Sequence, residues 1–136
     1  MTIPGSNKAV ASQPGRIVAF KLDGKATLAR DPGPLPRHNP TGTSWPAATT
    51  AEGDRLYGAY CFRCHGVLAR ASNVIPDLRR SGMLTDKDAW RSVVIDGAPT
   101  DCGMISWQHV MSARQAEAIR AYVDDAARKA KAGGTR

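Results

Sequence analysis

Cys61-Phe62-Arg63-Cys64-His65 is the stretch that decides how this chain folds. Two cysteines three positions apart, followed at once by histidine, form the pattern that attaches c-type haem. On one helical turn Cys61 and Cys64 share a face, so both thiols can reach the same porphyrin. We therefore predict one covalent haem c, with Cys61 and Cys64 as thioethers and His65 as the proximal iron ligand.

Two other chemistries use the same residue types. A redox dithiol of the thioredoxin type opens a helix within a βαβ unit, and no such pattern surrounds Cys61. A zinc site needs four ligands, and Cys102 would complete a set of three cysteines and one histidine. The adjacent histidine and a later Gly-Met pair favour haem over both alternatives.

The distal iron ligand is predicted to be a methionine. The chain has four, which are Met1, Met83, Met104 and Met111. Met104 follows Gly103, which lets backbone approach a flat cofactor, and enough chain separates it from His65 to cross to the opposite face. Met83 is the next candidate. Cys102 is a possible thiolate ligand, although a free thiol near the haem edge is the favoured interpretation.

Three further contacts with the haem are expected. The carbonyl of Pro76 is the candidate acceptor for the ring N–H of His65 that iron does not use. Arg79 and Arg80 can neutralise a propionate, although both also suit an ordinary surface. Trp107, in the same segment as the predicted distal ligand, completes the expected cofactor contacts.

The 136 residues predict one small domain with a tail, and the charge is uneven. Residues 1–45 hold six Lys or Arg against two Asp, out of a net charge of +7. No basic run is interleaved with aromatic residues, so we expect no nucleic acid partner. No stretch is long enough to span a membrane. A basic face can steer an acidic redox partner or serve solubility alone.

Composition divides the chain into three parts. Residues 1–30 form a tail whose Gly15-Arg16-Ile17-Val18-Ala19-Phe20-Lys21-Leu22 run has strand character but needs a partner strand. Residues 31–48 read as a semi-rigid, Pro-rich linker, in which His38 is expected to be solvated. Residues 49–132 form the haem domain. Covalent haem is attached outside the cytoplasm, so we expect a periplasmic protein, although residues 1–6 are no secretory signal.

The haem domain is predicted to be all-α, with three to four helices around one haem. The first helix is capped by Thr50 and ends at Gly66, and residues 67–84 are loop-like. The second follows a cap at Thr85 and stops at Gly97. The third follows the capping box Ser112-Ala113-Arg114-Gln115.

The last helix has a clear inward and outward face. The inward stripe is Ala116, Ile119, Tyr122, Val123, Ala126 and Ala127, and the solvated side is Asp124, Asp125, Arg128 and Lys129. Tyr122 is expected to pack against the first helix near Gly53 and Tyr60. Gly133-Gly134 closes this helix.

Several runs resemble one family within the class I cytochromes c. They are Val74-Ile75-Pro76-Asp77-Leu78-Arg79-Arg80-Ser81, Val94-Ile95-Asp96-Gly97-Ala98, Gly103-Met104 and Ala116-Glu117-Ala118-Ile119-Arg120-Ala121-Tyr122-Val123. They are similar to the C-terminal cytochrome domain of quinohaemoprotein alcohol dehydrogenases, in which a Pro-rich linker joins a PQQ-containing β-propeller to such a domain. Residues 15–22 resemble the strand that closes the propeller. Cys102 is a departure from the family pattern.

The resemblance implies an electron-transfer domain that is not itself an enzyme. It would accept electrons from reduced PQQ in a propeller and pass them to a soluble redox protein, of azurin or cytochrome type. The alternatives are a stand-alone carrier cytochrome, a haem-based ligand sensor or peroxidase-like enzyme, and a zinc module. A peroxidase needs a distal base, and His109, the remaining histidine, is expected at the surface.

Overall fold

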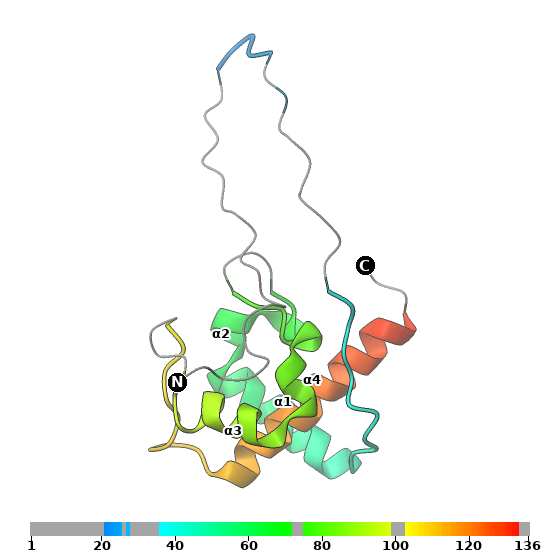
Figure 1. The fold of residues 1–136 in the computed structure, drawn as a ribbon, viewed down its shortest axis with the longest axis vertical. Helices are drawn as coiled ribbons and strands as arrows, with labels where there is room; N and C mark the ends of the chain where they lie inside the picture. Colours follow the sequence, from blue (N-terminus) through cyan, green and yellow to red (C-terminus); the bar gives the residue numbers. More distant parts are fainter. Residues whose placement is uncertain (1–20, 26, 28–35, 72–74, 99–102, 134–136) are drawn as a thin grey trace.

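A computed structural model describes residues 21–25, 27, 36–71, 75–98 and 103–133 (Figure 1). Within these ranges the chain is helical and contains no strand, so the all-α prediction is confirmed. The elements are α1 (Ala47–Tyr60), α2 (Phe62–His65), η1 (Val67–Ala69), η2 (Leu78–Arg80), η3 (Gly82–Thr85), α3 (Lys87–Val94) and α4 (Ala113–Ala132), where η denotes a 3-10 helix.

Helices α1 and α4 cross at Gly53 (Figure 1). A Cβ atom on Gly53 would lie 1.9 Å from the carbonyl oxygen of Ala118 and 2.9 Å from Cβ of Tyr122, so only glycine permits this approach. The predicted contact of Tyr122 near Gly53 is confirmed. Its aromatic partner is Tyr57, at 5.0 Å between ring centroids, whereas Tyr60 packs elsewhere.

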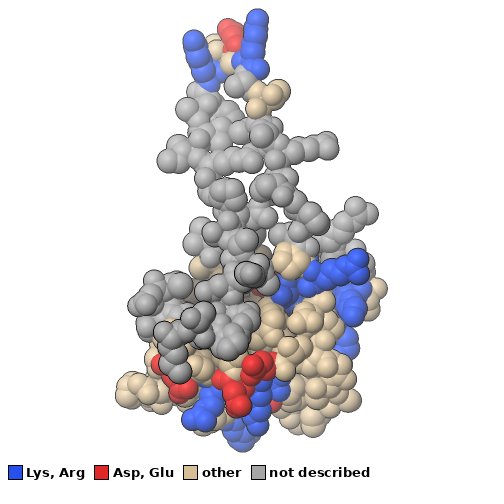
Figure 2. Space-filling view, viewed as in Figure 1, with Lys and Arg blue, Asp and Glu red and all other residues tan. Residues whose placement is uncertain are grey.

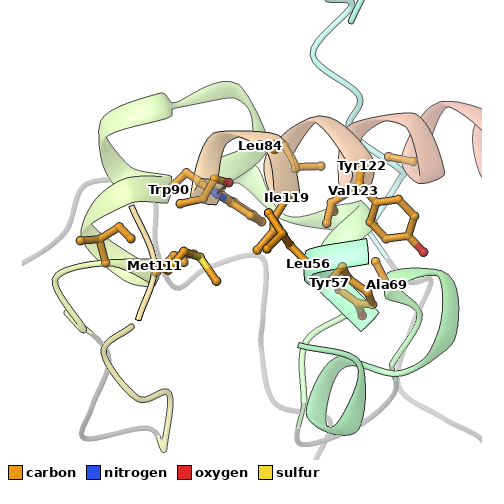
Figure 3. Packing of buried hydrophobic residues seen from close by; sticks show 14 residues of the cluster. Leu56, Tyr57, Ala69, Leu84, Trp90, Met111, Ile119, Tyr122 and Val123 are labelled. Carbon is orange, nitrogen blue, oxygen red and sulfur yellow. Dashed lines mark hydrogen bonds between the residues drawn. The ribbon is translucent and has the colours of Figure 1, made fainter. Parts of the chain in front are cut away.

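The hydrophobic core lies between α1, α3 and α4 (Figure 3). Its largest members include Leu56, Tyr57, Leu84, Trp90, Ile119 and Val123. The indole nitrogen of Trp90 donates to the carbonyl of Ala116 at 2.9 Å, which satisfies a polar group that would otherwise be buried without a partner. The inward stripe predicted for α4 is buried throughout.

Two helix starts differ from prediction. Helix α1 begins at Ala47 after Pro46, so Thr50 lies inside its first turn and is not the cap. Helix α3 is capped by Asp86, whose carboxylate accepts from the backbone N–H groups of Asp88 and Ala89. Thr85 was the predicted cap, but its hydroxyl donates to the carbonyl of Gly82 inside η3.

Helix α4 carries the predicted capping box, with Ser112 and Gln115 bonded reciprocally. Its predicted outward face is wrong at one position, because Asp124 is 0 % exposed. Its neighbours Asp125, Arg128 and Lys129 are more exposed, in agreement with prediction. Figure 2 shows acidic and basic side chains interspersed on the lower part of the visible face.

Residues 36–46, which we call the strap, run in extended form alongside α4 and lead into α1 (Figure 1). They fall within the predicted linker, yet they pack onto the haem domain along much of their length. His38 is half-buried and its Nε2 atom lies away from solvent, so the prediction of a solvated histidine is wrong.

Some predictions fall on residues that the structure does not describe. Apart from Lys21 and Leu22, the strand-like segment lies outside the described ranges, as does Cys102. Among the described helices, none has both the length and the apolar character needed to cross a bilayer.

Candidate haem site

The predicted attachment motif, residues 61–65, lies at the junction between α1 and α2. The backbone bends at Cys61, and a single turn follows in which the N–H groups of Cys64 and His65 bond to the Cys61 carbonyl at 3.2 and 3.0 Å. Both thiols are free; Cys61 is half-buried against the core and Cys64 is exposed. Burial, with a smaller effect of Cys64, raises the pKa of Cys61 to about 12, so Cys61 is a neutral thiol at pH 7.

Pro76 lies beside the ring of His65. The Nδ1 atom of His65 is 3.5 Å from the Pro76 carbonyl oxygen, and this contact suits an Nδ1–H donor. Burial lowers the pKa of His65, which keeps the imidazole neutral at pH 7. With the proton on Nδ1, the lone pair of Nε2 is free to bind a metal.

The chain reverses sharply after His65. Gly66 ends α2 with φ +74°, and a Cβ there would lie 2.1 Å from the carbonyl oxygen of Arg70. Leu68 and Ala69 also have positive φ, at 56° and 57°, which is costly for residues with a side chain. The buried hydroxyl of Tyr57 donates to the Gly66 carbonyl at 2.6 Å and so ties this reversal to α1.

The loop that carries Met104 lies outside the hydrophobic core. Met111 is buried in that core and Met83 packs against it, whereas Met104 is half-buried and follows Gly103. Gly103 has φ +84°, and among the residues that the structure describes no atom lies within 4 Å of a Cβ placed there. Residues 99–102, directly before Gly103, lie outside the described ranges.

Trp107 joins the Met104 loop to the attachment motif. Its ring packs edge-on against Tyr60, at 5.3 Å between centroids, and Tyr60 directly precedes Cys61. Its backbone N–H donates to the carbonyl of Val94 at the end of α3. The structure thus places the ring of Trp107 against the residue that directly precedes Cys61.

Arg79 and Arg80 lie together on η2 and share one carboxylate. Arg79 donates to both oxygens of Asp77 at 2.8 and 2.6 Å, and Arg80 donates to the same group at 3.3 Å. These bonds hold the pKa of Asp77 below its usual value, although burial acts in the opposite direction. Both arginine side chains are only 10 % exposed, so neither is an ordinary surface residue. His38 packs near this cluster.

Sequence reasoning missed three residues, of which Tyr57 and Asp77 shape this region and Asp124 lies under the strap. No role was predicted for Tyr57, and Asp77 was noted only as part of a run resembling a family. Asp124 was assigned to solvent. The signal for Tyr57 was a hydroxyl on an otherwise apolar face, since a buried tyrosine needs a partner for its hydroxyl. Nothing local distinguishes Asp124 from Asp125.

The donor set fits a haem c group better than a zinc ion. Two free thiols on one turn and a neutral imidazole with Nδ1 engaged are what covalent haem requires on its proximal side. Within the part of the chain that the structure describes, no three His, Cys, Asp or Glu side chains are grouped to hold a metal ion. Fold and site together define a c-type cytochrome domain.

Comparison with known proteins agrees with this class. A family model described as cytochrome c oxidase, cbb3-type, subunit III matches residues 48–123, so the chain belongs to this family of cytochrome c domains. The predicted class I cytochrome c fold is thereby confirmed, and membership implies haem c and electron transfer as the general function.

The most similar relatives include parts of quinone-linked dehydrogenases. The chain is 36 % identical over 115 residues to the dehydrogenase subunit of alcohol dehydrogenase (quinone) from Komagataeibacter europaeus, covering 79 % of this chain and 15 % of that protein. It is 33 % identical over 126 residues to quinohemoprotein alcohol dehydrogenase ADH IIB from Pseudomonas putida, covering 90 % and 17 %. The chain thus spans under a fifth of these relatives, and the predicted resemblance to quinohaemoprotein alcohol dehydrogenases is confirmed.

A third relative shows that the resemblance is not confined to alcohol dehydrogenases. The chain is 35 % identical over 122 residues to lupanine 17-hydroxylase [cytochrome c] from a Pseudomonas species, covering 86 % of this chain and 17 % of that protein.

Proposed function

We propose that this chain is an electron-transfer domain that accepts single electrons from reduced PQQ in a quinohaemoprotein alcohol dehydrogenase and passes them to a soluble redox protein. The observation that carries the proposal is the His65–Pro76 contact beside two free thiols on one helical turn. That combination presents Nε2 of a neutral imidazole to a haem held by Cys61 and Cys64.

Cys61 and Cys64 attach one haem covalently. The two thiols would hold the haem through thioether bonds to its vinyl groups, an addition that needs no oxidant. Cys61 is a neutral thiol at pH 7, as such an addition requires.

His65 and Met104 are the proposed axial ligands. Met83 and Met111 pack with the core, which leaves Met104 as the one methionine of the described residues outside it. When bound, the haem supplies reversible one-electron chemistry at its iron, and a His/Met pair raises its reduction potential. Arg79, Arg80 and Trp107 would contact the haem periphery.

The donor and the acceptor come from the relatives' chemistry. The part of each quinone-linked alcohol dehydrogenase that resembles this chain is under a fifth of that protein. Those enzymes must therefore oxidise their substrate elsewhere in the polypeptide. We therefore place alcohol oxidation outside this chain and assign it electron transfer alone. Because haem is attached covalently outside the cytoplasm, the proposed location is the periplasm.

Optical spectroscopy of protein made in cells that attach haem to c-type cytochromes tests the site. We expect a Soret band that survives denaturation, with a pyridine haemochrome typical of two thioether bonds. A variant with both Cys61→Ala and Cys64→Ala should lose covalent haem. Retention of haem by that variant, or protein that binds zinc and shows no Soret band, would refute the assignment.

The axial ligand has its own test. The ferric protein should show the weak far-red absorption of sulfur ligation, and the reduced protein should bind carbon monoxide poorly at neutral pH. Met104→Ala should abolish the far-red band and open the iron to carbon monoxide, whereas Met83→Leu should change neither. Ready carbon monoxide binding by the unaltered protein would favour a sensor over an electron carrier.

A further inference from the structure

Asp124 holds the strap from a position inside the protein. Its Oδ1 accepts from the backbone N–H of Thr41 at 2.6 Å, and its Oδ2 accepts from the Thr41 hydroxyl at 2.9 Å and the Trp45 indole at 2.7 Å. Arg128 adds a contact at 3.3 Å to the same carboxylate. One fully buried charge therefore binds two residues that are separated from it by about 80 positions along the chain.

Trp45 and Thr43 have further contacts on α4. The guanidinium of Arg120 lies 5.0 Å from the centroid of the Trp45 ring, an arrangement that favours a cation over the ring face. Arg128 donates to the carbonyl of Thr43 at 3.0 Å. The C-terminal half of the strap is thus bonded at alternate residues, Thr41, Thr43 and Trp45, with backbone and side chains both engaged.

The N-terminal half of the strap is bonded to the proximal loop. The N–H of Asn39 donates to the carbonyl of Arg79 at 3.0 Å, and Arg80 donates to the carbonyl of Pro36. Arg79 and Arg80 belong to η2, which follows Pro76, the partner of His65. At Pro36 the chain therefore lies on the loop that supports the proximal histidine.

Such bonding is unlike that of a free tether. A buried carboxylate left without its donors is costly, so the docked state is favoured by the whole set of bonds at Asp124. Proline residues within the strap restrict its backbone further and lower the entropy lost on docking. The strap and the helices should therefore move as one body.

We propose that Asp124 is a positioning residue which fixes the strap to α4, so that the chain enters the haem domain beside the proximal loop and holds a preceding electron donor at a defined distance from the haem. This inference rests on the proposed function, because it requires a donor upstream in the same polypeptide. A loose linker would let the donor sample many distances, whereas a docked one presents it to one side of the domain.

Amide hydrogen exchange tests whether the strap is docked on α4. It is measured on the full polypeptide that also carries the electron donor. We expect Asp124→Asn to raise the exchange rates of the Thr41 and Thr43 amides by about ten- to a hundredfold, since an amide nitrogen then faces several donors. Thr41→Val leaves α4 unaltered and removes the hydroxyl that bonds to both Asp124 and the Thr43 N–H, so it should raise the same rates if Asp124→Asn fails to fold. Asp125→Asn is the matched control. Unchanged rates in a folded Asp124→Asn or Thr41→Val protein would overturn the inference.

Rapid mixing of the oxidised polypeptide with alcohol tests the functional consequence. The haem should be reduced about ten- to a hundredfold more slowly in Asp124→Asn and Thr41→Val than in Asp125→Asn or the unaltered protein. The midpoint potential of the haem should stay the same in all four, which separates positioning from a change at the iron. If the strap is released but the haem is reduced at an equal rate, the role of Asp124 is refuted and the proposed function is unaffected. Failure of alcohol to reduce even the unaltered haem refutes the proposed function and this inference together.

Discussion

Tyr57 shows how one hydroxyl group can secure the strained turn that follows the proximal histidine. It is 2 % exposed, and burial raises its pKa well above the usual value, so it stays protonated and donates to the Gly66 carbonyl. Positive φ angles at Leu68 and Ala69 need a surrounding structure that holds them. The bond from α1 supplies part of that support.

Replacing Tyr57 with phenylalanine should therefore destabilise the protein. The half-buried Gly66 carbonyl would lose its donor, and we expect the free energy of unfolding to fall by about 1–3 kcal/mol. Urea denaturation measures this directly. Tyr60→Phe is the control, because Tyr60 is 38 % exposed and its contact with Trp107 is made by the ring. Equal losses in the two variants would contradict the role assigned to the Tyr57 hydroxyl.

Because His38 is half-buried, the free energy of unfolding depends on its protonation, whereas a solvated histidine would have no such effect. Burial lowers its pKa below 6.5, and Arg80 and Arg79 lower it further, while Asp77 acts in the opposite direction. Between the folded pKa and 6.5 the unfolded chain binds more protons than the folded chain. The free energy of unfolding should then rise with pH across that window.

Substitution of His38 by glutamine should flatten this rise. Urea denaturation at a series of pH values on both sides of 6.5 measures the slope. The exposed His109 offers a matched control in His109→Gln, which should keep the slope of the unaltered protein. If His38→Gln keeps the slope as well, another group is responsible for it.

At the scale of helices, the contact of α1 with α4 depends on the missing side chain at Gly53. Gly53→Ala would drive a methyl group into the Ala118 backbone, at 1.9 Å from its carbonyl oxygen, so the helices must separate. We expect a loss of about 1–3 kcal/mol or more in the free energy of unfolding. Thermal denaturation followed by circular dichroism measures the change.

Gly58 provides the matched control on the same helix. A Cβ on Gly58 would meet no atom within 4 Å, so Gly58→Ala should stabilise the helix by about 0.5–1 kcal/mol. Opposite signs for the two substitutions would show that packing, and not helix propensity, requires glycine at position 53. A similar gain in both variants would contradict the close crossing.

At the scale of the whole molecule, we expect the haem to add to the hydrophobic core. Phe62, Ile75 and Ile105, which are the neighbours of Cys61, Pro76 and Met104 along the chain, are 42 %, 36 % and 58 % exposed in the protein alone. A porphyrin packed beside them would remove apolar surface from water. Haem binding would thus stabilise the domain beyond what its protein core provides.

Protein made without haem should accordingly unfold at a lower temperature. Each kcal/mol contributed by the haem is worth about 4–8 °C in the melting midpoint of a domain of this size. Comparing loaded protein with the Cys61→Ala, Cys64→Ala double variant by circular dichroism gives the difference. Equal midpoints would mean that the haem adds nothing to the fold.

The sequence by itself determined the class of the protein. Spacing within Cys61-Phe62-Arg63-Cys64-His65 is a local property of one helical turn, and the capping box at Ser112 and the inward stripe of α4 are local too. Such patterns depend on neighbours within a few positions, which a sequence displays directly. The all-α fold followed from them, whereas the family followed from the runs that resemble quinohaemoprotein alcohol dehydrogenases.

Only the tertiary structure decided which polar groups are buried and what they bind. Asp124 and Asp125 are adjacent acidic residues on one helix, yet the first is enclosed by the strap and the second is not. The difference arises from residues about 80 positions away, which no local pattern reveals. The same holds for Tyr57 and His38, whose partners and burial depend on segments brought together by folding.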